Sequence, residues 1–189
     1  MELPLTYYGK PVLRKKCIRV EEINDEIKRL VGDMIDTMRT CNGIGLAAPQ
    51  VNQSLAIFVT EVPIPVKKIG KGSSDKNEEE HVEWESGKVR VFINPKILKY
   101  SDEQWTQDEG CLSIPGLYAP VTRPVTITVQ ATDLDGKVFE EEFSWLDARA
   151  IMHENDHING TLFIDRIHGK LRKELEAKLN TIKKKFFKD

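Results

Sequence analysis

Apolar residues recur every three or four positions in two segments of the chain, which is the spacing that places them on one face of a helix. The first segment starts after Asn24, a residue type that favours helix N-caps, and it stops at Asn42 and Gly43. Its apolar face consists of Ile27, Leu30, Val31, Met34, Ile35 and Met38. The second segment, about 170–187, predicts a C-terminal helix. The apolar face of that helix consists of Leu171, Leu175, Leu179, Ile182 and Phe186.

Runs rich in β-branched and aromatic residues have the composition of strands. They predict strands at 55–61 and 89–94, and a hairpin formed by 125–132 and 137–143. The sequence Asp-Leu-Asp-Gly at 133–136 separates the two arms of the hairpin and is a typical turn.

A further helix is predicted between Ser144 and about Asn159. Ser144 and Asp147 have the spacing of a capping box, and Gly160 ends the helix. Strands and helices do not alternate along the chain as they do in doubly wound folds, so the pattern favours an α+β fold. We expect this helix to be central and to pack against antiparallel or mixed β-sheets, with the N-terminal and C-terminal helices on the outside.

The length of 189 residues suits a single domain covering 1–189. One stretch, about 63–87, is polar and charged and has no periodic apolar face. We interpret it as a mobile surface insertion between two strands. The simplest interpretation of the insertion is a solvated loop without a role of its own.

Composition and charge exclude several classes of protein. Hydrophobic residues make up 40% of the chain and the net charge is −2, so nothing indicates disorder, a nucleic-acid surface or a membrane surface. No apolar run approaches the roughly 20 residues of a membrane span, and no signal or transit peptide is visible. The three cysteines favour a reducing compartment, and Cys17 and Cys41 are expected to pack as small apolar residues.

The sharpest chemical signal is the sequence His153-Glu154-Asn155-Asp156-His157. On a helix, positions i and i+4 lie only about 40° apart, so His153 and His157 can bind one metal ion. Glu154 lies about 100° from His153 and can reach water beside the ion without being a ligand. A coincidental pair of surface or packed histidines is the alternative.

A tetrahedral catalytic ion needs a third protein ligand. Cys111, His81, His168 and several carboxylates are the candidates. His81 lies in the insertion and His168 follows the end of a helix, so both are expected to be exposed. A Cys111 thiolate would neutralise one charge of a divalent ion and leave it a Lewis acid, whereas an inert buried thiol is the commoner fate of a lone cysteine.

Three segments of the chain resemble the signature motifs of one enzyme family. The segments are Gly43-x-Gly45-x-Ala47-Ala48-x-Gln50, Glu109-Gly110-Cys111-Leu112-Ser113 and His153-Glu154-x-Asp156-His157. Their order and spacing are similar to those of the peptide deformylases, and the likeness covers nearly the whole chain apart from the insertion.

The resemblance implies a metal-dependent amidase that removes the formyl group from the N-terminal methionine of nascent polypeptides. It implies that Cys111, His153 and His157 bind one divalent ion, with Fe²⁺ the usual physiological metal and Zn²⁺, Ni²⁺ or Co²⁺ also accommodated. Ligand chemistry alone does not choose among these metals.

The resemblance also assigns roles to other residues. Glu154 accepts the proton of the attacking water and returns one to the leaving amine. The Gln50 side chain and the Leu112 backbone N–H stabilise the oxyanion. The residues that line or hydrogen-bond the substrate are Ile44, Gly45, Leu46 and Gly110. An apolar pocket beside the metal helix accepts the methionine side chain.

Four positions near the motifs leave questions open. The family usually has an apolar residue where Asn155 stands and a glutamine where Met152 stands. Asn155 faces away from the ion and requires a polar partner or water. Asp156 is either a support for the site or a surface carboxylate. Arg123 is either structural, substrate-facing or an exposed loop residue.

From Gly169 onward the chain has eight Lys or Arg and three Asp or Glu. By analogy with bacterial relatives, the C-terminal helix is a candidate for docking on the ribosome, although a solvated helix face is the simpler interpretation. The family occurs in the bacterial cytoplasm and in mitochondria or plastids. The Lys/Asn/Glu-rich insertion slightly favours an organelle, with a targeting segment absent from this sequence.

Two competing functions remain. A zinc endopeptidase can also use His-Glu-x-x-His, but such enzymes commonly take their third ligand downstream of the helix. A catalytically inactive, deformylase-like binding protein is the second alternative, and the presence of every catalytic residue type in this sequence argues against it.

Overall fold

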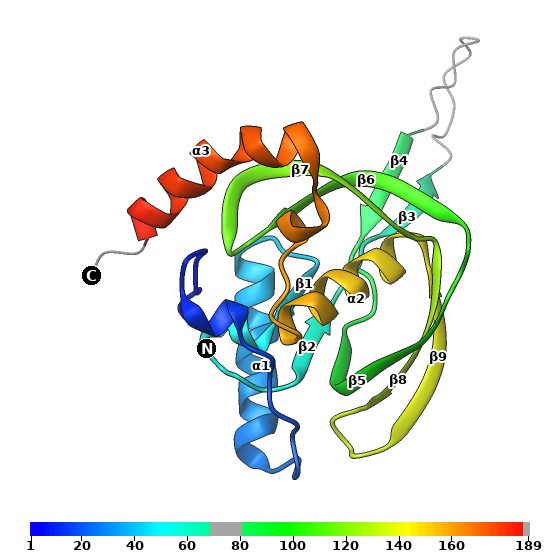
Figure 1. Ribbon diagram of the computed structural model, residues 1–189. Helices are drawn as coiled ribbons and strands as arrows, with labels where there is room; N and C mark the ends of the chain where they lie inside the picture. Colours follow the sequence, from blue (N-terminus) through cyan, green and yellow to red (C-terminus); the bar gives the residue numbers. More distant parts are fainter. Residues whose placement is uncertain (69–80, 187–189) are drawn as a thin grey trace, which may run out of the picture.

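The computed structural model describes residues 1–68 and 81–186, and their strands form three antiparallel sheets (Figure 1). A five-stranded sheet has the order β1 (Gly45–Ala47), β2 (Ile57–Thr60), β5 (Arg90–Tyr100), β8 (Thr126–Thr132) and β9 (Val138–Ser144). Two further sheets are the pairs β3 (Ile64–Lys68) with β4 (His81–Glu85) and β6 (Gln104–Cys111) with β7 (Ile114–Pro124). The α-helices are α1 (Asp25–Thr40), α2 (Trp145–Ile158) and α3 (Gly169–Phe186). Short 3-10 helices lie at Pro11–Arg14, Ala48–Val51 and Phe163–Arg166.

The predicted α+β class is confirmed, and so is the predicted start of α1. The Asn24 side chain accepts a hydrogen bond from the Ile27 backbone N–H at 3.1 Å and caps the helix. At the other end Asn42 adopts a left-handed φ of 54°, and the Gly43 N–H donates to the Met38 carbonyl at 2.9 Å. This geometry satisfies a carbonyl of the last turn, and it directs the chain into β1.

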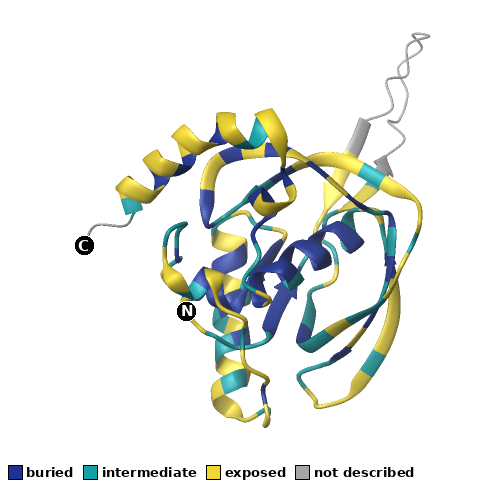
Figure 2. Cartoon of the chain, viewed as in Figure 1, coloured by how far each residue is buried: buried dark blue, intermediate teal, exposed yellow. Residues whose placement is uncertain are grey.

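Helix α2 begins where the sequence predicts, but the predicted capping box is wrong. Ser144 precedes the helix without capping it, and its hydroxyl lies 2.9 Å from the hydroxyl of Thr126 on the neighbouring strand β8. The Ser144 hydroxyl therefore bonds across the sheet to Thr126 and does not cap the helix. Figure 2 shows α2 buried along most of its length at the centre of the molecule. Its burial on nearly all sides explains why the helix has little amphipathic pattern.

Two apolar cores hold α2 and α3 in place. Beneath α2, the sheet contributes Phe58, Phe92 and Phe143, and the rings of Phe58 and Phe92 stack with centroids 4.7 Å apart. Helix α3 buries Leu175, Leu179 and Ile182 against β7, as the periodicity predicts. Among the described residues, no helix combines the length and the apolar character needed to cross a membrane.

Several strands are not predicted by the sequence. Strands β6 and β7 form a long hairpin. Their sequences do not have the pattern of strands, because β6 is mostly polar, even at the buried Glu109, and β7 contains Pro115, Pro120 and Pro124. Strands β3 and β4 lie within the predicted insertion 63–87, so the insertion is not wholly a loop. The mobility predicted for it falls on 69–80, which lies outside the described residues.

Candidate metal centre

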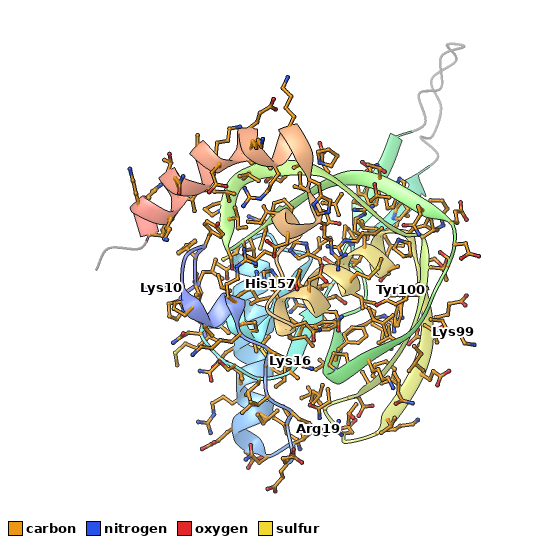
Figure 3. The ribbon with its side chains drawn as sticks, in the orientation of Figure 1. Lys10, Lys16, Arg19, Lys99, Tyr100 and His157 are labelled. Atoms are coloured by element: carbon orange, nitrogen blue, oxygen red, sulfur yellow. The ribbon has the colours of Figure 1, made fainter. Side chains whose placement is uncertain are left out.

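Three potential metal ligands converge where α2 meets the β6–β7 hairpin. His153 and His157 lie one helical turn apart on α2, and Cys111 is the last residue of β6. The ligand atoms of these three residues all lie within 4.8 Å of one another. Cys111 Sγ is 3.2 Å from His157 Nε2. His157, labelled in Figure 3, is 1% exposed, whereas Cys111 is half-buried.

This donor set fits a divalent transition-metal ion. Ligand bonds of about 2.0–2.3 Å in a tetrahedral site require donor atoms roughly 3–4 Å apart. Cys111 Sγ and His157 Nε2, 3.2 Å apart, have this separation, and all three ligand atoms lie within 4.8 Å of one another. His153 uses Nδ1 to contact the carboxylate of Glu109 at 3.0 Å, which leaves Nε2 for an ion. One thiolate and two imidazoles can hold zinc, iron, nickel or cobalt, so the ligands do not identify the metal.

Glu109 is the centre of a buried ionic network behind His153. Its Oε1 accepts hydrogen bonds from Arg123 Nε and Arg149 Nη1, both at 2.6 Å. Its Oε2 accepts from Arg123 Nη2 at 2.8 Å and contacts His153 Nδ1 at 3.0 Å. Four contacts fill the acceptor positions of the carboxylate and prevent it from turning. The network therefore fixes the orientation of the His153 ring.

The charges of this network shift the pKa of Glu109. Burial by itself raises the pKa of the Glu109 carboxyl, but the hydrogen bonds from Arg123 and His153 outweigh burial and hold the pKa well below its usual range. Glu109 is therefore a fixed negative charge that orients a ligand, and it is unsuited to exchanging protons during a reaction.

The same network decides two of the open questions. Arg123 is only 2% exposed and donates to Asp156 Oδ2 at 2.9 Å as well as to Glu109, so it is a structural residue. Asp156 is also buried and accepts a second hydrogen bond, from Arg166 Nε at 2.6 Å. Asp156 supports the site through Arg123. Among the described residues, none of its side-chain hydrogen bonds goes to Cys111, His153 or His157.

The departures from the family pattern do not disturb the ligands. Asn155 is partly exposed, so water can satisfy its amide. Met152 is buried and packs in the core beneath α2. His168 is exposed, as predicted, and the side chain of His81 lies outside the described residues. Cys17 is packed as expected, and burial raises the pKa of its thiol to about 11.

Glu154 faces the site from the helix position next to His153. Its Oε2 is buried and has no hydrogen-bond partner among the described residues. Burial raises the pKa of Glu154 to about 7, although the positive charges of His153 and Arg123 oppose the rise. A Cβ added at Gly45 would lie 2.6 Å from Glu154 Oε1, so only glycine lets β1 approach this carboxylate.

Gln50 also points into the site. Its Oε1 accepts a hydrogen bond from the Ala47 backbone N–H at 2.7 Å, which fixes the orientation of the amide. Its Nε2 consequently faces Cys111 Sγ at 3.5 Å. The side chain can therefore present an N–H donor beside the three ligands.

A cavity of about 530 Å³ opens onto two of the ligands, Cys111 and His153. Its walls include three of the four predicted substrate residues, namely Ile44, Gly45 and Gly110, together with Leu112, whose backbone was predicted to bind the oxyanion. Leu46 is not among the lining residues, because its side chain is fully buried between α1 and the sheet. Only the backbone of Leu46 is left to face a substrate. Glu109 and Arg149 also border the cavity, and no role was predicted for either from the sequence.

Spacing alone gave no signal for two of the supporting arginines. Arg149 lies one helical turn before His153, and its Nη1 also donates to the Val121 carbonyl at 3.0 Å. Arg166 lies in the 3-10 helix Phe163–Arg166 after α2. Basic residues outside the three motifs look like ordinary surface residues in a sequence. Only the fold buries Arg149 and brings Arg166, which stays 42% exposed, against Asp156.

Comparison with known proteins agrees with this site. The family model described as polypeptide deformylase matches residues 2–173. Peptide deformylase 1 of Clostridium perfringens is 45% identical over 161 residues, which cover 85% of this chain and 95% of that protein. A crystal structure of a plant peptide deformylase superposes with a TM-score of 0.82 at 36% identity, covering 97% of this chain and 90% of that one.

A longer relative matches along almost the whole of this chain. The chloroplastic and mitochondrial peptide deformylase 1B of Arabidopsis thaliana is 37% identical over 184 residues, or 97% of this chain. This chain spans 61% of the length of that relative. The family model, these relatives and the cluster of Cys111, His153 and His157 agree with one another: the chain belongs to the peptide deformylase family.

Proposed function

We propose that this protein hydrolyses the formamide at the N-terminus of formylmethionyl polypeptides. The observation that carries the proposal is the convergence of Cys111, His153 and His157 on one point of a cavity, with the Glu154 carboxylate beside them. Such a site would combine a metal ion with a group that can move protons, and this combination can cleave an amide at neutral pH.

We assign each chemical step to a residue of the site. A divalent ion held by the three ligands would act as a Lewis acid and lower the pKa of water toward about 7, making hydroxide available. Glu154 accepts the proton of the attacking water and delivers one to the leaving amine. The Gln50 amide and the Leu112 backbone N–H donate hydrogen bonds to the oxyanion, and each such donor is worth about 10²–10³ in rate.

Strand β1 offers a binding edge for the peptide. Among the described strands it pairs with β2 alone, so its other edge is available for an added strand. Ile44, Gly45 and Gly110 line the cavity along this edge. The methionine side chain packs against the apolar wall formed by Leu146 and Ala150 of α2. Its burial there contributes about 1.5–3 kcal/mol to binding.

We propose Fe²⁺ as the physiological ion, with Zn²⁺, Ni²⁺ and Co²⁺ as functional replacements. Protein purified without oxygen is expected to contain iron in stoichiometric amount by elemental analysis and to deformylate formyl-Met-Ala-Ala. Chelation should abolish the activity, and restoring Fe²⁺ should recover it.

Two control substrates test the selectivity for the formyl group and the alternative function of a zinc endopeptidase. The acetylated peptide Ac-Met-Ala-Ala should react far more slowly, because its extra methyl group needs additional space beside the metal ligands. A peptide blocked at both ends tests for endopeptidase activity, and cleavage of its internal bonds would contradict the proposal. Deformylation that survives complete removal of metal would contradict it as well.

Helix α3 is the proposed contact with the ribosome. Its solvent-facing side carries exposed Lys173 and Lys178, while its other side is held against β7 by buried leucines. Deleting α3 would uncover that core, so the charge-reversal variant Lys173→Glu/Lys178→Glu is the better test. Recovery of ribosomes by the wild-type protein and reduced recovery by the variant at low salt are expected. Equal recovery would reject the docking role.

The compartment follows the relatives, which are bacterial or belong to chloroplasts and mitochondria. We propose that this protein acts where formylated polypeptides are made, in a bacterial cytoplasm or in an organelle of bacterial descent. The charged insertion slightly favours the organelle.

A further inference from the structure

The cavity at the metal centre extends to a rim built from both ends of the chain. Leu5 and Tyr7 line it from the N-terminal segment, and Phe186 lines it from the last turn of α3. The rings of Tyr7 and Phe186 stack with centroids 3.9 Å apart and an interplanar angle of 20°. Both rings are only partly buried, so apolar surface remains on the rim.

The rim is tied to the loops that carry the catalytic motifs. The Thr6 backbone N–H donates to the Gln50 carbonyl at 2.7 Å, and the Tyr8 N–H donates to the Ser113 carbonyl at 2.8 Å. Tyr7 lies between these two bonds. The N-terminal segment is therefore fixed relative to Gln50 and to the turn between β6 and β7, which follows Cys111.

The end of α3 rests on the same segment. A Cβ added at Gly9 would lie 2.9 Å from Cγ of Lys183, which places the last turns of α3 directly over residues next to Tyr7. The stack of Tyr7 on Phe186 continues this contact to the cavity. The rim is consequently a built feature, made from two segments that are far apart in the sequence.

The size of the cavity exceeds what one methionine needs. Its volume of about 530 Å³ lies within the roughly 300–1,000 Å³ of cavities that enclose whole small molecules. A peptide added to the edge of β1 would advance about 3.3 Å per residue away from the ligands. The residues after methionine would then extend into the rest of the cavity, whose lining includes Tyr7 and Phe186.

We propose that the Tyr7–Phe186 rim binds apolar side chains at the second and third positions of the formylated peptide. This inference rests on the proposed deformylase function and makes the two chain ends determinants of substrate preference. The rim contacts the substrate away from the reacting atoms, so it acts on KM and leaves kcat nearly unchanged.

Steady-state kinetics with three peptide amides test the inference. The peptides are formyl-Met-Ala-Ala, formyl-Met-Phe-Ala and formyl-Met-Ala-Phe. For the wild-type protein we expect at least one phenylalanine peptide to have a KM about fivefold to tenfold lower than the alanine peptide, because part of a ring becomes buried. The variants Phe186→Ala and Tyr7→Ala should each reduce this difference to less than about threefold while kcat stays the same.

The matched control is Leu171→Ala, at the other end of α3. Leu171 packs partly buried against the same core as Phe186 but does not line the cavity. It should therefore lower the melting temperature without changing the discrimination between peptides. Tyr7 lies outside α3, so Tyr7→Ala removes half of the rim without altering the helix. It therefore tests the inference even if loss of the Phe186 ring loosens α3.

Two results would overturn the inference. One is a wild-type protein that treats all three peptides alike, and the other is unchanged discrimination in both rim variants. Failure of the proposed function has a different signature, since the wild-type protein would then release formate from none of the peptides. That result would remove the basis of the inference as well.

Discussion

The Glu154→Ala variant is expected to keep its metal ion and lose deformylation. Glu154 borders the cavity beside His153 but is not one of the three ligands. Its removal should therefore leave the metal content unchanged. Loss of a general acid–base group typically costs about 10²–10⁴ in rate, so kcat should fall by at least that amount. Formate release and elemental analysis of the same preparation provide the two measurements.

Two companion variants make the Glu154 result specific. Glu154→Gln keeps the shape of the side chain and should be nearly as slow as the alanine variant, because an amide cannot accept the proton. Glu142→Ala removes an exposed carboxylate from β9 and should leave the rate unchanged. Wild-type turnover by Glu154→Ala would reject the acid–base role. Loss of metal together with activity would mean that Glu154 helps to hold the ion.

Replacing Arg123 with methionine should produce the largest loss of stability. Its guanidinium is 2% exposed and joins two buried carboxylates, those of Glu109 and Asp156. Methionine fills similar space but leaves both carboxylates short of a positive partner, and breaking a buried ion pair in this way costs about 3–5 kcal/mol. Arg149 and Arg166 still contact the carboxylates, so a value near the lower end is expected.

Urea unfolding of the metal-free protein measures this loss directly. The control is Arg90→Met, which breaks the Arg90–Glu141 pair near the surface and removes an arginine from above the Phe143 ring. A partly exposed pair contributes about 0–1 kcal/mol, so the control should stay close to the wild type. Equal free energies of unfolding for Arg123→Met and the control would show that the buried network does not stabilise the fold.

The network links the stability of the fold to the geometry of the metal site. Glu109 orients His153 through Nδ1, and the two arginines on Glu109 hold the carboxylate in place. Partners of this kind commonly change metal affinity about 10–100-fold when they are removed. The Arg123 variant should accordingly bind its ion more weakly as well as unfold more easily.

The elements with strong periodicity were predictable because their signals are local. Helix α1 has a capping asparagine and one apolar stripe, and the β8–β9 hairpin surrounds a four-residue turn. The metal ligands were also within reach. His153 and His157 lie on one helix face, where spacing alone sets their geometry. Cys111 lies in a segment that resembles a peptide deformylase motif.

Other features depended on partners that are distant in the sequence. Ser144 does not cap α2 as predicted, because its hydroxyl lies within hydrogen-bond distance of Thr126 on the neighbouring strand. Strand β6 was missed because it is mostly polar, even at the buried Glu109, and its pairing with β7 decides its conformation. Leu46 belongs to a motif, yet the sheet directs its side chain into the core and away from the cavity.

The sequence by itself determined the family, the α+β class and the side chains that can bind a metal, because helix spacing and short motifs encode these locally. Only the tertiary structure decided what surrounds them. The carboxylate behind His153, the arginines that neutralise it and the aromatic rim all come from segments far apart in the chain. Charge compensation and ring stacking act over a few ångströms of space, and no sequence spacing reports that distance before the chain has folded.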